Sequence, residues 1–424
     1  MASDILHIKD AYYFEVPRAL WKSNRKTIDE FPEHYVRLDP DYQTWEAARQ
    51  YKGLTGIKGL DDVPSQDSLI EQWHAWQHDH AHFAKPFDRF LEEAPSQAWF
   101  QRQLAIGPFA KKQSGETNEE LAARVEKAAP LRDAWAAVET NAESVAEYKQ
   151  SVKEWSPEKV VEYNKMLDGK ILIPQPFGKL RNNYEKESGF AISKFMILEA
   201  VVAVLLIAIF WRLAHRIKDG KPVRGRLWNM FEAFLLFIRD EVARPAIGGH
   251  DADRFVPLLW TIFMFVLGLN LLGMLPWMGS PTASFSVTLA MAAVTFVTVV
   301  IAGSMRFGVL GFWKNQVPHM GLPTILAIFI VPMLFIIEVL GLFIKHAVLA
   351  VRLLANMVAG HLVLLAIMGI AVATAGSGVW PVSATISVIG SALISLLELF
   401  VAFLQAYVFT FLSALFIGAA VHHH

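Results

Sequence analysis

The second half of this chain carries so few charges that it restricts the fold to one built inside a membrane. From Leu353 to Val421, Glu398 is the only residue among Asp, Glu, Lys and Arg. An apolar run of that length exceeds the roughly 20 residues that one helical crossing of a bilayer requires. Because lipid offers no hydrogen-bond partners, each backbone amide must be paired within the chain, which favours helices. We therefore predict an all-α membrane domain over residues 190–424.

The residues before this domain have a different composition and predict a soluble extension over residues 1–189. This part holds 25 Lys and Arg against 31 Asp and Glu, whereas the remainder holds 14 against 9. A polar stretch at 111–118, KKQSGETN, divides the extension. Asn118 before two glutamates predicts the start of a helix that Pro130 would break. We expect a mostly helical or irregular region whose helices dock on partner proteins.

The sequence lacks the residues that several classes of site require. It has no cysteine, which excludes disulfides and thiolate metal sites. It has no nucleotide-binding motif, and we predict no cofactor and no nucleic-acid partner. His74 and His78 would share a helix face, as a metal-binding pair does, but no cysteine or acidic pattern completes that site. A solvated or packing role is therefore favoured for these two histidines.

The N-terminus does not resemble a targeting peptide. Asp4, Asp10 and Glu15 interrupt the first fifteen residues, whereas presequences are poor in acidic residues and secretory signals carry an apolar core. Import of this chain would therefore use another signal, or the numbering starts after processing.

Three shorter apolar helices and one interfacial helix are predicted ahead of the longest helices. A first span over about 195–211 is followed by a loop with six Lys and Arg residues and one Asp. The positive-inside rule places this loop on the matrix or cytoplasmic side, and the extension on the opposite side. Residues 227–238 are apolar, short and flanked by charge, which indicates an interfacial amphipathic helix. Spans at 255–277 and 282–305, joined by the turn PWMGSP, form a transmembrane hairpin.

Two helices too long for an upright crossing follow this hairpin. They are predicted over 322–373 and 379–418, separated by the turn TAGSG at 374–378. At 1.5 Å per residue each would be on the order of 60 Å or more, against a hydrocarbon core of about 30 Å. We therefore expect both to be strongly tilted, near-horizontal helices.

Polar residues recur along these two helices at helical spacing. Glu338, Lys345 and Arg352 are seven residues apart and stay near one face, with Asn356 one turn later. His361 lies about 180° around the helix from Arg352. In the last helix Glu398 and Gln405 are again seven apart, and share a face. Two packed helices of this kind suggest aqueous clefts at each end, with a charged barrier between them.

These residue types suit a proton path. Carboxylates and imidazoles exchange protons near neutral pH, whereas a guanidinium does not, so Arg352 would act as a gate. Glu398 and His361 would then handle protons on one side of it, and Glu338 on the other. Alternative interpretations remain. Arg352 could be a structural partner of Glu338 or Glu398, and Lys345 could reach the lipid headgroups or pair with Glu338. His361 could be an ordinary buried, hydrogen-bonded histidine, and Glu338 a solvated carboxylate near the interface.

Four stretches resemble subunit a of F-type ATP synthases, of the mitochondrial type. They are RLLANMVAGH at 352–361, NLLGMLP at 270–276, the approach of Glu338 to Arg352, and LELFVAFLQAYVFTFL at 397–412. Together they cover about residues 190–418. The resemblance implies that Arg352 faces a c-ring, with Asn356 in its motif and Gln405 packed nearby. It further implies that His361 and Glu398 line the lumenal half-channel, and that Glu338 lines the matrix half-channel.

The extension of about 190 residues has no counterpart in this family that we can match. It suggests a divergent, mitochondrial protein of protist type, located in the inner membrane with the extension in the intermembrane space. The extension would bind lineage-specific subunits of the Fo stator or help to join two synthases.

The leading hypothesis is thus a noncatalytic, proton-conducting stator subunit that couples proton flow to rotation of a c-ring. An ion-coupled secondary transporter is a second class, in which Arg352 would bind substrate. Transporters of that class commonly contain internal repeats, and the sequence shows none. A membrane scaffold is a third class, which would require neither Arg352 nor Glu398.

Overall fold

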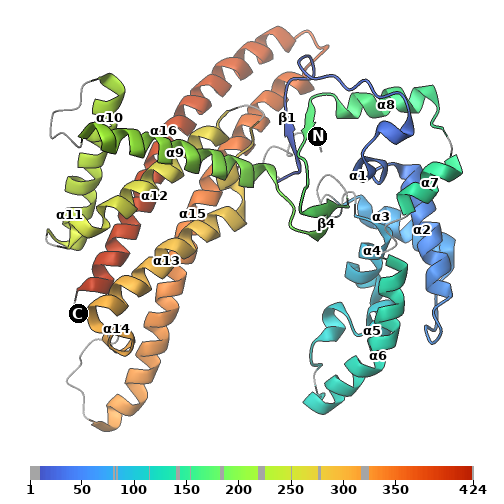
Figure 1. Cartoon of the computed structure of the whole chain (residues 1–424), viewed down its shortest axis with the longest axis horizontal. Coiled ribbons are helices and arrows are strands. Elements are labelled where there is room, and N and C mark those ends of the chain that lie inside the picture. The colour runs from blue at the N-terminus through green and yellow to red at the C-terminus, as the bar shows by residue number, and fades with distance from the viewer. Residues whose placement is uncertain are drawn as a thin grey trace. The chain divides into compact units, whose positions relative to one another are not determined.

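The structure is a computed structural model in which helices dominate both halves of the chain (Figure 1). It describes residues 10–79, 82, 85–113, 115–139, 144–152, 154–181, 186–217, 225–249, 251–275, 278–316 and 324–422. The chain divides into two compact units. One is Val16–Ala191, and the other combines the first 15 residues with Ile192–His424. The predicted basic loop at 218–224 lies outside the described residues, as does part of the PWMGSP turn.

The unit Val16–Ala191 consists of helices, short 3-10 turns and short strands. Its helices are α1 (Glu33–Val36), α2 (Pro40–Thr55), α3 (Gln66–Gln77), α4 (Phe87–Glu93), α5 (Ala98–Leu104), α6 (Asn118–Glu139), α7 (Ser144–Val152) and α8 (Pro157–Leu167). The 3-10 turns are η1 (Ile28–Glu30), η3 (Pro95–Gln97) and η4 (Gly107–Ala110), and the strands are β2 (Lys170–Leu172), β3 (Gly178–Leu180) and β4 (Lys186–Gly189). Strands β3 and β4 pair antiparallel.

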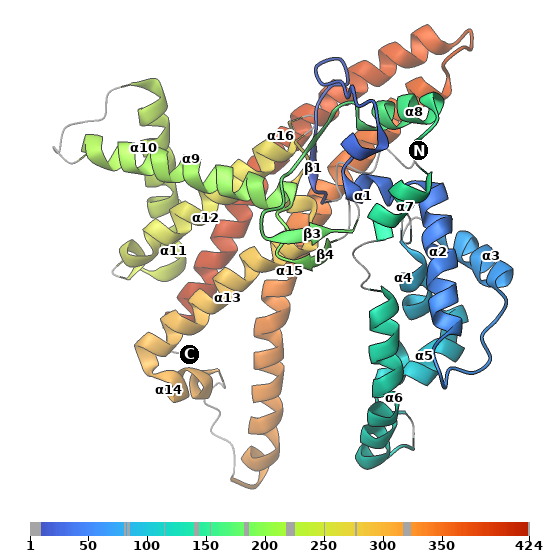
Figure 2. The same cartoon turned by 45° about the vertical axis from the view of Figure 1, so that its right-hand side comes forward.

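Aromatic side chains fill two cores in this unit. Trp73, Phe90 and Trp135 belong to the first, where α6 lies beside α2 and α5 (Figure 2). The second core gathers residues of η1, α1, α2, α7 and α8, among them Tyr42 and Tyr163. Burial of large aromatic side chains contributes most of the apolar area removed from water in so small a core. Packing in these cores therefore accounts for the buried tryptophans Trp73, Trp135 and Trp155.

A single buried carboxylate joins three helices around the second core. Asp39, 1 % exposed, precedes Pro40 at the start of α2 and accepts the amide of Asp41. It also accepts the hydroxyls of Tyr148 at 3.0 Å and Tyr163 at 2.9 Å, from α7 and α8. Lys159 Nζ lies 2.6 Å from the same carboxylate. Burial and the neighbouring Asp39 charge raise the pKa of Tyr148 and Tyr163, so both phenols remain donors.

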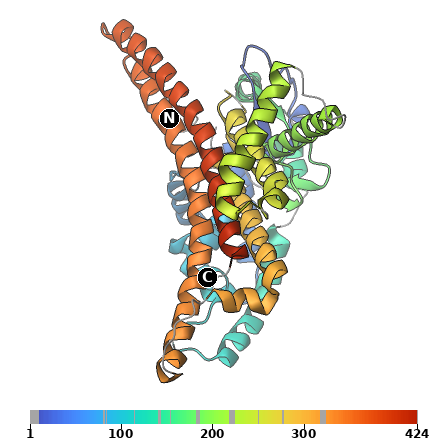
Figure 3. The same ribbon diagram turned by 90° about the vertical axis from the view of Figure 1, so that its left-hand side faces the viewer.

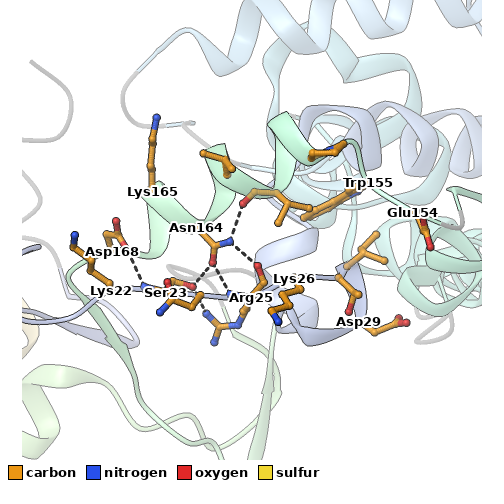
Figure 4. Close-up of a pocket in the computed structure, with 16 residues that line it drawn as sticks. Lys22, Ser23, Arg25, Lys26, Asp29, Glu154, Trp155, Asn164, Lys165 and Asp168 are labelled. Carbon is orange, nitrogen blue, oxygen red and sulfur yellow. Dashed lines mark hydrogen bonds between the residues drawn. The ribbon is translucent and has the colours of Figure 1, made fainter.

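Asn164 of α8 holds an extended segment of the chain in a similar way. Its Oδ1 accepts the amide of Arg25 at 3.0 Å and the hydroxyl of Ser23 at 2.6 Å, while its Nδ2 donates to the Arg25 carbonyl at 2.8 Å (Figure 4). The same side chain also donates to the carbonyl of Val160 within α8. Segment and helix together border a pocket of about 940 Å³. The extended segment thus obtains from a side chain the hydrogen bonds that a sheet would otherwise supply.

Helix α6 confirms one boundary predicted from sequence and contradicts another. It begins at Asn118, where Thr117 and Glu120 form reciprocal side-chain-to-amide hydrogen bonds of 3.2 and 2.8 Å. The predicted break at Pro130 is wrong, because the helix continues to Glu139. Proline removes one amide donor and crowds the preceding turn. Here Arg132 donates to the carbonyl of Val125 at 2.9 Å, and Trp135, buried beyond the proline, anchors the rest of the helix.

The second unit contains the apolar helices. They are α9 (Lys194–Ile217), α10 (Arg226–Phe237), the π-helical turn η5 (Ile238–Ala243), α11 (Arg244–Ile247), α12 (Ala252–Gly273), α13 (Phe285–Phe307), α14 (Val309–Asn315), α15 (Thr324–Ala373) and α16 (Trp380–Val421), with strand β1 (Tyr13–Glu15) and the 3-10 turn η6 (Pro281–Ala283). Within the described residues, five are long and apolar enough to cross a membrane: α9, α12, α13, α15 and α16. This confirms the predicted all-α class with two very long helices.

Helix α12 forms the centre of this unit. It packs against α9, η5 and α16, and its side chains of Leu259, Val266 and Leu269 are fully buried. The short α11 packs against the C-terminal end of α16, where a Cβ at Gly418 would lie 2.1 Å from the carbonyl of Ala246. Only glycine permits that approach.

Helices α15 and α16 run side by side over most of their length (Figure 3). α15 has 50 residues and α16 has 42, so α15 alone is about 75 Å long at 1.5 Å per residue. Thr374 and Ser383 hydrogen bond at 2.5 Å beside the turn, and Gly390 faces Ile367 further along. The tilt of the pair relative to a membrane stays a prediction.

Candidate functional site

Arg352 lies on an exposed, apolar face of α15. Its neighbours on that face, Val348 and Val351, are 50 % and 49 % exposed. Across the described residues, no carboxylate lies within ion-pair distance of the guanidinium. In particular, neither Glu338 nor Glu398 pairs with it, so the structure gives no support to a structural salt bridge. A permanent charge therefore lies beside exposed apolar side chains.

The register of the two long helices places Gln405 beside this charge. Thr374 meets Ser383, Ile367 meets Gly390, and Gly360 meets Glu398. Continuing the same antiparallel register brings Arg352 level with Gln405. Gln405 is 8 % exposed, whereas Arg352 is exposed and Asn356 is half-buried. The predicted arginine and glutamine thus lie at one level of the helix pair.

His361 and Glu398 form a pair across the two helices. His361 Nδ1 lies 3.5 Å from Glu398 Oε1, and Glu398 is only 6 % exposed. Gly360 makes room for the carboxylate, because a Cβ at that position would lie 2.8 Å from Oε1. Oε1 has no hydrogen bond among the described residues. A buried carboxylate oxygen in this state is costly unless water or a proton serves it.

Glu338 lies in a separate pocket near the other end of α15. The pocket has a volume of about 380 Å³ and is lined by Val299, Asn315, Gln316, Glu338, Leu342, Lys345, Phe416, Ala419 and Ala420. Glu338 is half-buried and Lys345 is exposed. Amide, carboxylate and ammonium groups together make this a polar cavity in an apolar unit. The pocket brings Glu338 and Lys345 together, as their seven-residue spacing predicts.

The two carboxylates lie on opposite sides of Arg352 along the helix pair. Glu338 precedes Arg352 by 14 residues of α15, a distance of about 21 Å at 1.5 Å per residue. Glu398 lies level with Gly360, eight residues beyond Arg352, or about 12 Å along the helix. Two groups able to exchange protons are thus separated by one that cannot.

The structure also identifies residues that sequence patterns did not single out for chemistry. Asn270 of α12 is 1 % exposed and donates to the carbonyl of Ala402 at 3.2 Å. His346 of α15 is 4 % exposed and contacts the wall of the Glu338 pocket. Each is a polar residue inside an apolar helix, and that signal is visible in the sequence. Gly360 carries no such signal, because its role depends on the partner helix.

The two histidines considered for metal binding lie elsewhere. His74 stacks on Trp73 with ring centroids 4.9 Å apart, and His78 is the C-terminal cap of α3. In the described part of the chain, no group of three or more His, Cys, Asp or Glu side chains could hold a metal ion. His74 is exposed as well as stacked, which is compatible with the solvated or packing role that the sequence favours.

Comparison with known proteins identifies relatives of the second unit. The family model for the ATP synthase A chain matches residues 196–418. ATP synthase subunit a of Myxococcus xanthus is 41% identical over 237 residues, which cover 55% of this chain and 75% of the relative. Subunit a of Anaeromyxobacter sp. is 45% identical over 225 residues, or 52% of each chain. ATP synthase subunit a 2 of Chlorobaculum tepidum is 37% identical over 262 residues, 61% of this chain and 72% of the relative.

These relatives correct one expectation drawn from the sequence. They are bacterial, so a mitochondrial location is not supported. The expectation rested on an unmatched extension, and an extension does not identify a cellular compartment. What the comparison does support is a multi-pass membrane protein.

Proposed function

The chain belongs to the ATP synthase A chain family, and on that premise we propose how its own residues conduct protons. As subunit a it is the noncatalytic, proton-conducting stator subunit of Fo, and it partners the c-ring and other Fo subunits. Two half-channels would reach the level of Arg352 from opposite sides. The His361–Glu398 pair would form one, and the Glu338 pocket the other. The observation that carries this proposal is that Arg352, which has no ion-pair partner among the described residues, lies between two separate sites able to exchange protons.

Arg352 acts in this scheme as an electrostatic gate. A guanidinium keeps its proton at any physiological pH, so it cannot pass one on. When a c-ring carboxylate comes opposite Arg352, the fixed charge favours release of the carboxylate's proton. Gln405 lies at the same level and supplies an uncharged hydrogen-bonding group. The exposed apolar face around Arg352 fits a surface that slides against the helices of a rotor.

The His361–Glu398 pair would load or collect protons on the side away from the basic loop. A carboxylate and an imidazole 3.5 Å apart can share a proton, and both side chains exchange protons near neutral pH. Asn356 lies between this pair and Arg352 on α15, where it would orient water without titrating. Each proton would therefore reach the rotor from one side only.

The Glu338 pocket would serve the basic side of the membrane. Its walls include Asn315 and Gln316, which directly follow Lys314 at the end of α14. By the positive-inside rule Lys314, like the predicted basic loop after α9, belongs to the cytoplasmic side. The unit Val16–Ala191, which precedes α9, would then lie on the opposite side. We assign to that unit the binding of other stator subunits, or contact with a second synthase.

Replacement of Arg352 tests the proposal most simply. The complete ATP synthase is reconstituted in lipid vesicles with Arg352→Ala, and ATP-driven proton pumping is followed with a pH-sensitive dye. We expect pumping to be abolished while the complex stays assembled. Arg244→Ala, which changes an exposed arginine outside the α15–α16 pair, is the matched control and should pump normally. Full pumping by Arg352→Ala would reject the proposal and favour a scaffold.

A further inference from the structure

His346 is a buried imidazole in α15 that the proposed path does not use. Its side chain is 4 % exposed, and its Nδ1 lies 2.8 Å from the carbonyl oxygen of Leu342. Because a carbonyl oxygen only accepts, Nδ1 carries the hydrogen and Nε2 holds the free lone pair. Nε2 has no hydrogen-bond partner among the described residues. A buried basic nitrogen without a partner is unfavourable, which points to a water molecule at that atom.

The surroundings of His346 connect it to the Glu338 pocket. The ring packs edge-on against Phe296 of α13, with ring centroids 5.3 Å apart, and tilted against Phe416 of α16, with ring centroids 4.9 Å apart. Leu342, which accepts its hydrogen bond, and Phe416 are both lining residues of that pocket. The imidazole therefore lies directly behind the pocket wall. Arg352 follows six residues later on the same helix, less than two turns away.

Few charged groups other than those of the Glu338 pocket lie on the elements that pack against this imidazole. The charged residues that the neighbouring elements carry in their described parts are Glu338, Lys345 and Arg352 on α15, Arg306 at the end of α13, Lys314 on α14 and Glu398 on α16. Glu398 lies level with Gly360, on the far side of Arg352. Arg306 lies 4.0 Å from Asp251. Among these groups Glu338 is the proton-exchanging carboxylate on the His346 side of Arg352.

We propose that His346 is a second proton-exchanging residue of the Glu338 pocket, carrying protons between its water and the level of Arg352. This inference rests on the proposed function of that pocket. In the step, the Nε2 lone pair takes a proton from hydronium in the pocket water and leaves a water molecule. The resulting imidazolium keeps its Nδ1 hydrogen on Leu342. Return of the Nε2 proton to water restores the neutral ring, and no other bond changes.

The test uses the complete ATP synthase in vesicles with His346→Gln. Glutamine keeps a donor for the Leu342 carbonyl but does not titrate. We expect ATP-driven pumping to slow about tenfold or more, and the part of its pH profile that reports titration of this imidazole to disappear. His215→Gln, at an exposed site near the end of α9, should leave both unchanged. An assembled His346→Gln complex with the wild-type rate and pH profile would overturn the inference.

A measurement on the unaltered protein covers the case in which the variant does not assemble. Deuterium exchange at the imidazole C2 position, resolved by peptide mass spectrometry, reports the pKa and water access of each histidine. We expect His346 to exchange, at a rate that changes with pH as its ring titrates. Absence of exchange at His346 would contradict the inference. Arg352→Ala separates the two proposals. If this variant still pumps protons, the proposed function fails. If it does not pump but His346→Gln pumps normally, only the inference about His346 fails.

Discussion

Asp39 in the unit Val16–Ala191 and Glu398 in α16 are both buried carboxylates, but their surroundings differ. Asp39 is 1 % exposed and receives two tyrosine hydroxyls and an ammonium group. Glu398 is 6 % exposed, faces one histidine at 3.5 Å, and leaves Oε1 without a hydrogen bond among the described residues. A fully partnered charge holds helices together, because removal of any partner is costly. An under-partnered charge suits a group that gains and loses a proton.

The largest effect is expected at the under-partnered carboxylate. Glu398→Gln keeps the size of the side chain but removes its ability to titrate, so we expect ATP-driven proton pumping to fall by about 10² or more. Assembly of the complex should be unaffected, because Glu398 makes few contacts that depend on its charge. Pumping is measured in vesicles, and assembly by native gel electrophoresis. Pumping at the wild-type rate by Glu398→Gln would show that titration of this carboxylate is not required for proton transfer.

The partnered carboxylate should respond in the opposite way. Asp39→Asn leaves Lys159 without its buried partner and offers an amide donor to two hydroxyl donors. We expect the unit Val16–Ala191 to lose about 2–4 kcal/mol of stability. Amide hydrogen exchange in the assembled complex should speed up across α2, α7 and α8, while proton pumping per intact complex is retained.

Asp41→Asn is the matched control for this prediction. Asp41 also lies 2.6 Å from Lys159 Nζ, but its side chain is 76 % exposed. Exposed ion pairs contribute about 0–1 kcal/mol, so its loss should change amide exchange very little. Equal effects of the two substitutions would show that burial is not what distinguishes Asp39.

The smallest expected effect concerns a half-buried histidine of the first unit. Burial, with the nearby Arg37 and Arg25 charges, lowers the pKa of His34 to about 4 from 6.5. The folded state therefore binds this proton less readily than the unfolded chain, so the stabilisation is present above pH 6.5 and is lost as pH falls toward 4. Wild-type amide exchange near α1 should accelerate over this window more than in His34→Gln. Identical pH dependence of the two proteins would contradict this assignment.

The helices of the membrane unit were largely predictable because composition determines them. The predicted limits 322–373 and 379–418 match α15 and α16 to within three residues at each end. The seven-residue spacing of Glu338 and Lys345 predicted that they lie near one helix face, and both line the same pocket. What the spacing could not predict was register between helices. The approach of Glu398 to Gly360, and of His346 to Phe416, depends on how α15 packs against its neighbours.

The first unit was less predictable for a related reason. Asp39 is 109 residues from Tyr148 and 124 from Tyr163, and no local pattern relates the three. Pro130 illustrates the same limit, because local propensity predicted a break that tertiary packing of Trp135 overrides. Tertiary contacts between distant residues therefore decide this unit, whereas hydrophobicity alone decides most of the other.

Cross-linking tests most directly whether Arg352 faces the rotor. The chain has no cysteine, so single cysteines can be introduced without a background of its own. Val351→Cys lies on the exposed face of Arg352, and Ala350→Cys, fully buried, is its control. With one cysteine beside the carboxylate of each c subunit, oxidation should join Val351→Cys to a c subunit and leave Ala350→Cys unlinked. Failure of Val351→Cys to link to any c subunit, in an assembled complex, would contradict the account.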